Sequence, residues 1–193
     1  MARKKYQFRP DRTGADVWNK LYITPAQRKT ILKWSMYGLA CLLMLIVQDA
    51  MLSRVRLFGG FLDLTPCAII LICVMEGLES GSLFALIGSM VYVFSGSAPD
   101  TFAIAFLTVY TVALTLFREQ FLRRSFSSAW LCTAVAVMLY EMSVFLMGLF
   151  LGLTYPDRMG VFALSGLLTV LIVPALYPLM TWIGKLGGET WKE

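Results

Sequence analysis

The chain has 193 residues, of which 58% are hydrophobic and 15% are charged, and its formal net charge is +5. Soluble domains carry about 25% charged residues, so this composition excludes a water-exposed globular fold and indicates one domain with lipid as its solvent. Histidine is absent from the sequence, which removes the usual general base and the commonest metal ligand.

The first 29 residues are a basic arm. Nine of the 17 Lys and Arg residues lie between Arg3 and Lys33. Such a run is either a solvated tail or a segment that contacts anionic lipid headgroups. Nucleic-acid binding is the weakest interpretation, because no groove of aromatic and basic residues accompanies the charge. The polar region is too long for a cleavable signal peptide, so the first apolar segment is expected to remain as an anchor.

A transmembrane domain is expected over residues 30–184. A spanning helix needs about 20 mainly apolar residues, and Pro25 is typical of a first helical position. The first helix is therefore expected to run from Pro25 through Lys33 to about Met51. Later helices are expected at about 100–117, 127–153 and 159–182.

The stretch 64–99 between them admits two interpretations. It is apolar apart from Glu76 and Glu79, so it is either two helices joined by a tight turn at 76–80 or one long kinked helix. Two helices give six spans, with 14 basic residues on the cytoplasmic side and 3 outside, whereas five spans give 10 and 7. The positive-inside rule favours six. We therefore expect an all-α bundle of six transmembrane helices with both termini cytoplasmic and a short tail, 185–193.

Tryptophan placement agrees with this topology. In the six-span arrangement Trp34, Trp130 and Trp182 all fall at the cytoplasmic interface, where an amphipathic indole is most stable.

No catalytic, cofactor or metal site is expected. The four cysteines lie in apolar stretches without metal-ligand spacing, so they are predicted to be reduced and buried. They are Cys41, Cys67, Cys73 and Cys132.

Glu141 is the one deep carboxyl group, in the middle of the charge-free stretch 125–156. A carboxylate at mid-bilayer costs several kcal/mol, so it is expected to face the bundle interior, to be protonated or to pair with a hydroxyl. The candidate hydroxyls belong to Tyr140, Ser143 and Tyr110. Glu141 is either a structural polar contact between helices or a proton, substrate or partner site.

Three further sets of residues are candidates, each with a structural alternative. Small residues at helical spacing permit close helix packing, either within the chain or with a partner helix; they are Gly77, Gly81 and Gly88.

Charged groups near the proposed cytoplasmic turns are either solvated, with acids and bases paired, or a docking point for a cytoplasmic partner; they are Glu76, Glu79, Arg118, Arg123 and Arg124. Outer-loop charges are either ordinary interfacial groups or contacts for an extracytoplasmic partner; they are Asp49, Arg54, Arg56 and Asp63.

Residues 48–103 resemble the rod shape-determining protein MreD family. The resemblance lies in an Asp-Leu pair beside a proline (Asp63-Leu64, Pro66), the spaced glycines named above and a small-residue turn at 95–98. The last span, with Pro174 and the Leu-Tyr-Pro segment at 176–178, is also similar to that of the family. The resemblance implies a non-enzymatic scaffold of the bacterial elongation machinery in the cell membrane. Such a scaffold binds the bitopic protein MreC and links cytoskeletal filaments to peptidoglycan synthesis.

Two other classes stay open. MreD-like proteins resemble in fold the substrate-binding membrane subunits of energy-coupling-factor vitamin transporters, so fold analogy does not separate the two. Those subunits usually gather aromatic and polar groups at an outer cavity, and the cytoplasmic tryptophans argue mildly against one here. A small intramembrane enzyme would need a cluster of acids, histidines or a metal at one depth, and the sequence offers a single deep carboxyl group.

Overall fold

The computed structural model describes residues 25–50 and 59–186, and this part of the chain is helical with no strand. The helices are α2 (Pro25–Ala50), α3 (Leu64–Glu76), α4 (Leu78–Phe94), α5 (Phe102–Phe121), α6 (Phe126–Phe150) and α7 (Met159–Leu186), with a 3₁₀ turn, η2 (Pro156–Arg158). The predicted all-α bundle of six helices is confirmed. Most of the basic arm and the end of the tail lie outside the described residues, as do Arg54 and Arg56.

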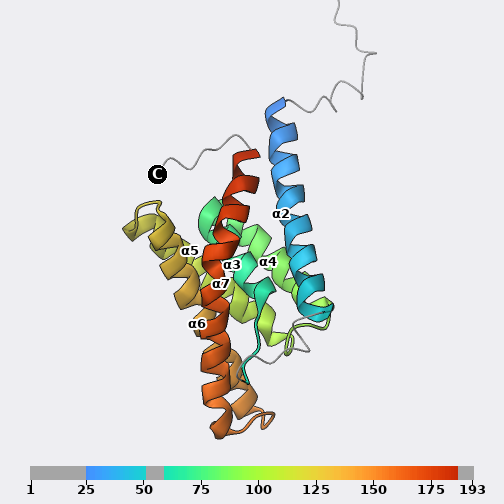
Figure 1. Ribbon diagram of the computed structural model, residues 1–193, viewed down its shortest axis with the longest axis vertical. Coiled ribbons are helices and arrows are strands. Elements are labelled where there is room, and N and C mark those ends of the chain that lie inside the picture. The colour runs from blue at the N-terminus through green and yellow to red at the C-terminus, as the bar shows by residue number, and fades with distance from the viewer. Residues whose placement is uncertain (1–24, 51–58, 187–193) are drawn as a thin grey trace, which may run out of the picture.

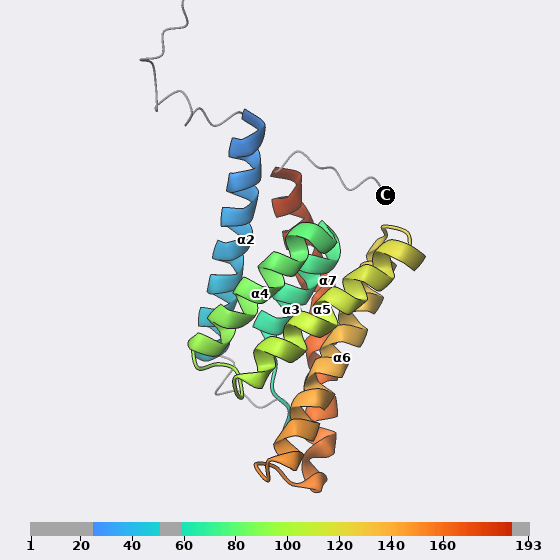
Figure 2. The same cartoon turned by 180° about the vertical axis from the view of Figure 1, so that it is seen from behind.

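Successive helices run in alternating directions along the bundle (Figures 1 and 2). One end, which we call the basic end, holds the start of α2, the turn between α3 and α4, the connection 122–125 and the end of α7. The opposite end holds the connections 95–101 and 151–158. The predicted basic connections therefore lie together at one end of the molecule.

In the part of the chain that the structure describes, four helices are long and apolar enough to cross a membrane: α2, α5, α6 and the continuous η2–α7 segment. This indicates a multi-pass membrane protein. Helices α3 and α4 have 13 and 17 residues, or about 20 and 26 Å at 1.5 Å per residue, less than the ~30 Å hydrocarbon core. Residues 25–50 and 59–186 therefore hold six α-helices, of which four have the length of a full span.

The short helix α3 forms the centre of the bundle. Every residue from Leu64 to Met75 is buried, and α3 contacts α2, α4, α5, α6 and α7. A helix that is apolar on all sides must be surrounded by protein or lipid, and here the other helices surround it. Because α3 has no lipid-facing surface, it does not have to match the thickness of the bilayer.

A single glycine ends α3 and begins α4. Gly77 has φ 100° and ψ 176°, a backbone conformation that side chains with a Cβ rarely adopt. The chain reverses there, so two helices are present and the single kinked helix is wrong. In contrast, α7 continues through Pro174 and Pro178 without a break.

Candidate functional site

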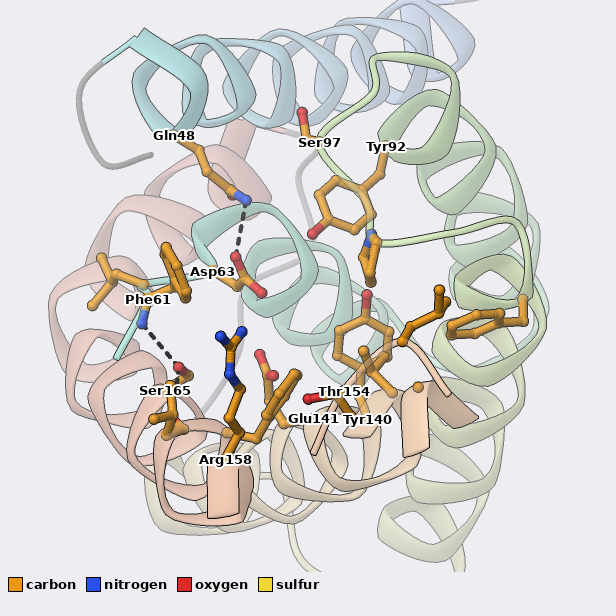
Figure 3. Close-up of a pocket in the computed structure, with 18 of the residues that line it drawn as sticks. Gln48, Phe61, Asp63, Tyr92, Ser97, Tyr140, Glu141, Thr154, Arg158 and Ser165 are labelled. Carbon is orange, nitrogen blue, oxygen red and sulfur yellow. Dashed lines mark hydrogen bonds between the residues drawn. The ribbon is translucent and has the colours of Figure 1, made fainter. Parts of the chain in front are cut away.

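A cavity of about 540 Å³ lies at the end of the bundle opposite the basic end (Figure 3). Its walls come from the ends of α2 and α4, the segment 61–63 before α3, the start of α5, α6, the beginning of α7 and the connections 96–99 and 153–158. We call it the polar cavity, because carboxyl, amide, phenol and guanidinium groups line it. These groups belong to Gln48, Asp63, Tyr92, Tyr140, Glu141 and Arg158.

Hydroxyl groups of α7 hold the segment that brings Asp63 into the cavity. The Phe61 amide donates to Ser165 Oγ at 2.9 Å, and the Asp63 amide donates to Thr169 Oγ1 at 3.1 Å. A Cβ at Gly60 would lie 3.2 Å from the backbone nitrogen of Ser165, so glycine permits this approach. The segment before α3 therefore has its amides satisfied by side chains one turn apart on α7.

Gln48 orients the Asp63 side chain. Its Nε2 donates to Asp63 Oδ1 at 3.1 Å, while its Oε1 accepts the Thr65 amide at 2.9 Å. The side-chain amide of Gln48 is buried, and its two hydrogen bonds have two effects. It satisfies one of the free donors in the first turn of α3 and directs one oxygen of the Asp63 carboxyl group.

Glu141 reaches the same cavity from the middle of α6. Its side chain points toward Asp63 (Figure 3), and the residue is 4% exposed. The predicted interior position is confirmed. The predicted hydroxyl partners are wrong, since Tyr110 and Ser143 bond to each other at 2.6 Å and Glu141 lies against the second carboxyl group instead.

Three buried polar atoms of this site make no hydrogen bond in the structure. They are Glu141 Oε1, the hydroxyl oxygen of Tyr140 and Thr154 Oγ1, and all three residues line the cavity. An unpartnered polar group away from water costs about 1–3 kcal/mol, and more when it is charged. Two adjacent carboxyl groups in such a place need a shared proton, a further donor or a positive charge between them.

A different polar cluster lies at the basic end. Lys33 Nζ is 2.6 Å from Glu76 Oε2, and both side chains are 7% exposed. The Tyr37 hydroxyl lies 2.8 Å from Glu76 Oε1 and 3.2 Å from the Met180 carbonyl oxygen. The expectation that Glu76 is a solvated acid near the arginines is therefore wrong: it forms a buried ion pair that joins α3, α2 and α7.

Arg118 and Glu119 hold the reversal at Gly77. Arg118, which is 1% exposed, donates through Nη1 to the Val74 carbonyl in the last turn of α3. Glu119 Oε1 accepts the amide of Leu78, the first residue of α4, at 2.9 Å. The signs suit the helix dipoles, because a cation lies at a C-terminus and an anion at an N-terminus. Arg118 is therefore a structural capping group.

The other charges near this end remain exposed. Glu79, Arg123 and Arg124 are exposed side chains, so of the five residues expected to form a cytoplasmic contact only these three are available to one. Trp130 and Trp182 are also exposed at this end, by 38% and 56%.

The spaced glycines are used for packing within the chain. A Cβ at Gly81 would lie 2.9 Å from the Cys73 carbonyl oxygen, and one at Gly88 would lie 3.1 Å from the Ile69 side chain. Gly77 faces Glu119. The stripe lets α4 approach α3 closely, which is the structural alternative of the two that the sequence left open.

Sequence reasoning missed the role of Asp63, Tyr92 and Arg158 in one cavity. Asp63 was expected to be an interfacial charge, yet it is enclosed between Gln48 and Glu141. No local pattern joins positions 63, 92, 141 and 158. The available signal was weaker: Glu141 needed a polar partner at its depth, and Asp63 is the acid closest to an apolar helix start.

Comparisons with known proteins add no identification: no protein-family model, curated protein or solved structure matches the chain. Within residues 25–50 and 59–186, no group of three or more Cys, Asp or Glu side chains is arranged to hold a metal ion. The four cysteines are free thiols; Cys41 is half-buried and the other three are buried.

Proposed function

We propose that this chain is a non-enzymatic multi-pass scaffold of the bacterial cell membrane, of the MreD type. In this role it binds an MreC-like bitopic protein and connects cytoskeletal filaments, with other elongation-machinery components, to peptidoglycan synthesis and cell shape. The sequence resemblance over residues 48–103 supports the proposal. So do the brief connections 95–101 and 151–155, which leave helix surfaces and the basic arm as the places where a partner is met.

The observation that carries the proposal is an apolar groove on the outer surface between α2 and α4. We call it the α2–α4 groove. Leu42, Ile87 and Val91 are exposed along it, and Gly38 lies at its base. A Cβ at Gly38 would meet no atom within 4 Å. Small residues that leave such space allow two helix backbones to approach, which is how helices associate in lipid without a hydrophobic driving force.

A hydroxyl group at the base of the α2–α4 groove favours a helix over a lipid chain as its occupant. Thr65 is 2% exposed, and its Oγ1 makes no hydrogen bond. A transmembrane helix with a serine, threonine or backbone carbonyl group facing the groove would satisfy it, whereas an acyl chain offers no hydrogen-bonding atom. The occupant that fits is the single transmembrane helix of a bitopic partner.

Orientation follows from charge. Among the described residues the opposite end carries Arg158, whereas the basic end carries Arg28, Lys29, Lys33, Arg118, Arg123, Arg124 and Lys185. The positive-inside rule then places the basic end, with both chain termini, in the cytoplasm. The basic arm is thereby available to cytoplasmic filaments and headgroups, and the polar cavity opens on the other side of the membrane.

Co-purification with the MreC-like protein of the same genome tests the proposal. The wild-type chain in nanodiscs should retain the partner, and Gly38→Leu should lower its apparent affinity by about tenfold, equivalent to ~1.4 kcal/mol. Gly160→Leu is the matched control, because Gly160 is another helical glycine with open space around it. Failure of the wild type to retain the partner would refute the scaffold. If the Gly38→Leu variant retained the partner as well as the wild type, the α2–α4 groove would not be the binding site.

The polar cavity favours a second candidate function, the substrate-binding subunit of an energy-coupling-factor transporter. Tyrosine and phenylalanine line the cavity in place of tryptophan, so the argument from the cytoplasmic tryptophans loses its force. Co-expression with the ATPase and coupling subunits separates the two candidates. A stable complex with those subunits, together with loss of MreC-like binding, would replace the scaffold proposal.

A further inference from the structure

The polar cavity holds acceptors that the packing of the bundle does not satisfy. Glu141 Oε1 and the Tyr140 hydroxyl make no hydrogen bond, although these residues are 4% and 1% exposed. Both groups line the cavity, and Figure 3 shows the Tyr140 hydroxyl directed toward that of Tyr92. A purely structural polar contact would be expected to close such a network, since a partly satisfied one is worse than an apolar core.

Two carboxyl groups meet inside the cavity. Asp63 and Glu141 bring their carboxyl groups together, and Gln48 donates one hydrogen bond to Asp63. Arg158 is the only Lys or Arg among the described residues that line the cavity. Its side chain is exposed, points toward the two acids (Figure 3) and makes no ion pair there. One guanidinium at the mouth leaves the interior with an excess of acceptors.

The walls around the acids are aromatic. Phe61, Tyr92, Phe102, Tyr140 and Phe162 all contribute to the lining. Aromatic faces attract an organic cation held within about 6 Å of the ring centre, and a volume of about 540 Å³ lies within the range of ~300–1,000 Å³ typical of small-molecule sites. A bare metal ion would use neither the rings nor the volume.

We infer that the polar cavity is a binding site for a small organic cation, an amine or a protonated heterocycle. The nitrogen lies between Asp63 and Glu141, donating to the free Glu141 oxygen, and the Tyr140 hydroxyl donates to or accepts from the ligand. The apolar part of the ligand lies against the rings. Arg158 stands at the entrance, where it repels a cation and so weakens binding.

This inference does not rest on the scaffold proposal. The α2–α4 groove and the polar cavity are separate places on the molecule and share no lining residue. If the chain is instead the transporter subunit, a small organic cation is its substrate class. Loss of amine binding and loss of the MreC-like partner are therefore distinguishable results.

Thermal shift and calorimetry on the full chain in nanodiscs provide the test, with three probes of similar shape: 2-phenylethylamine, 2-phenylethanol and phenylacetate. The amine should raise the melting temperature and bind at least tenfold more tightly than the neutral alcohol, and the carboxylate should not bind. Native mass spectrometry of the purified chain should show a cationic small molecule released on unfolding. Selective binding of the alcohol or the carboxylate would overturn the inference, as would stabilisation by sodium or potassium ions alone.

Variants locate the site. Glu141→Gln should weaken amine binding at least tenfold, while Glu79→Gln, at an exposed acid of the basic end, should leave it unchanged. Arg158→Gln should strengthen amine binding several-fold, and it tests the inference even if Glu141→Gln does not fold, because Arg158 is exposed. The inference fails if neither variant changes amine affinity, or if the wild type binds no amine and releases no cation.

Discussion

Removal of the lysine from the buried Lys33–Glu76 pair should destabilise the bundle strongly. Both side chains are 7% exposed and the atoms are 2.6 Å apart. Lys33→Met leaves the Glu76 carboxylate in a place closed to water with Tyr37 as its remaining donor. Breaking a buried pair in this way costs about 3–5 kcal/mol.

The expected melting shift follows from that free energy. For chains of 150–250 residues each kcal/mol moves the melting temperature by about 2–4 °C, so Lys33→Met should lower it by roughly 6–20 °C. Circular dichroism of the full chain in detergent measures this shift. Lys29→Met, at an exposed lysine one turn earlier on α2, is the control and should melt with the wild type.

A double variant separates charge from packing. Lys33→Met with Glu76→Gln removes both charges and keeps a side-chain oxygen for Tyr37, so it should regain much of the lost stability, with a coupling of about 0.5–3 kcal/mol. If Lys33→Met melts with the wild type, or if the two losses simply add, the pair is not the buried interaction argued here.

Gly81→Val should destabilise the bundle by about 1–3 kcal/mol, because its Cβ would lie 2.9 Å from the Cys73 carbonyl oxygen. Ser165→Ala removes the acceptor of the Phe61 amide and should cost about 1–3 kcal/mol, read as a lower melting temperature. In intact cells, Arg123→Cys should react with a membrane-impermeant maleimide only after the membrane is opened, because positive charge favours the cytoplasmic side.

Each of these three predictions has a matched control. Gly160→Val meets open space and should escape the packing penalty of Gly81→Val. Thr181→Ala, which loses an exposed hydroxyl bonded to the Pro178 carbonyl, should have little effect. Tyr155→Cys, at an exposed position of the opposite end, should react in intact cells. Labelling of Arg123→Cys from outside would reverse the orientation and move the polar cavity to the cytoplasm.

The helices were predictable because the bilayer imposes a length and composition on each segment. The expected first helix, Pro25 to about Met51, matches α2, and the turn expected at 76–80 is found at Gly77. Apolar content, the proline at the helix start and the glycine at the reversal are local signals, each with its own physical cause. The distribution of Lys and Arg similarly predicted which connections share one end.

The partners of the polar groups were not predictable in the same way. The hydroxyls considered as partners of Glu141 were near it in sequence or on the preceding helix, yet Tyr110 and Ser143 bond to each other and Glu141 meets Asp63. Glu76 was expected to be solvated or paired with the arginines at 118–124, but it pairs with Lys33, 43 positions earlier. At these depths the described residues offer several buried acceptors and few donors. Which acceptor meets which donor depends on how each helix is rotated about its axis relative to its neighbours.

By itself the sequence determined that the protein is apolar enough to lie in a membrane, where the helices of the described residues fall and which ends carry positive charge, because those properties depend on segments taken one at a time. Only the tertiary structure decided that α3 is enclosed, that Arg118 and Glu119 cap its reversal and that two acids line one cavity. The reason is physical: burial and hydrogen bonding depend on how each helix is rotated about its axis against its neighbours, and no single segment contains that information.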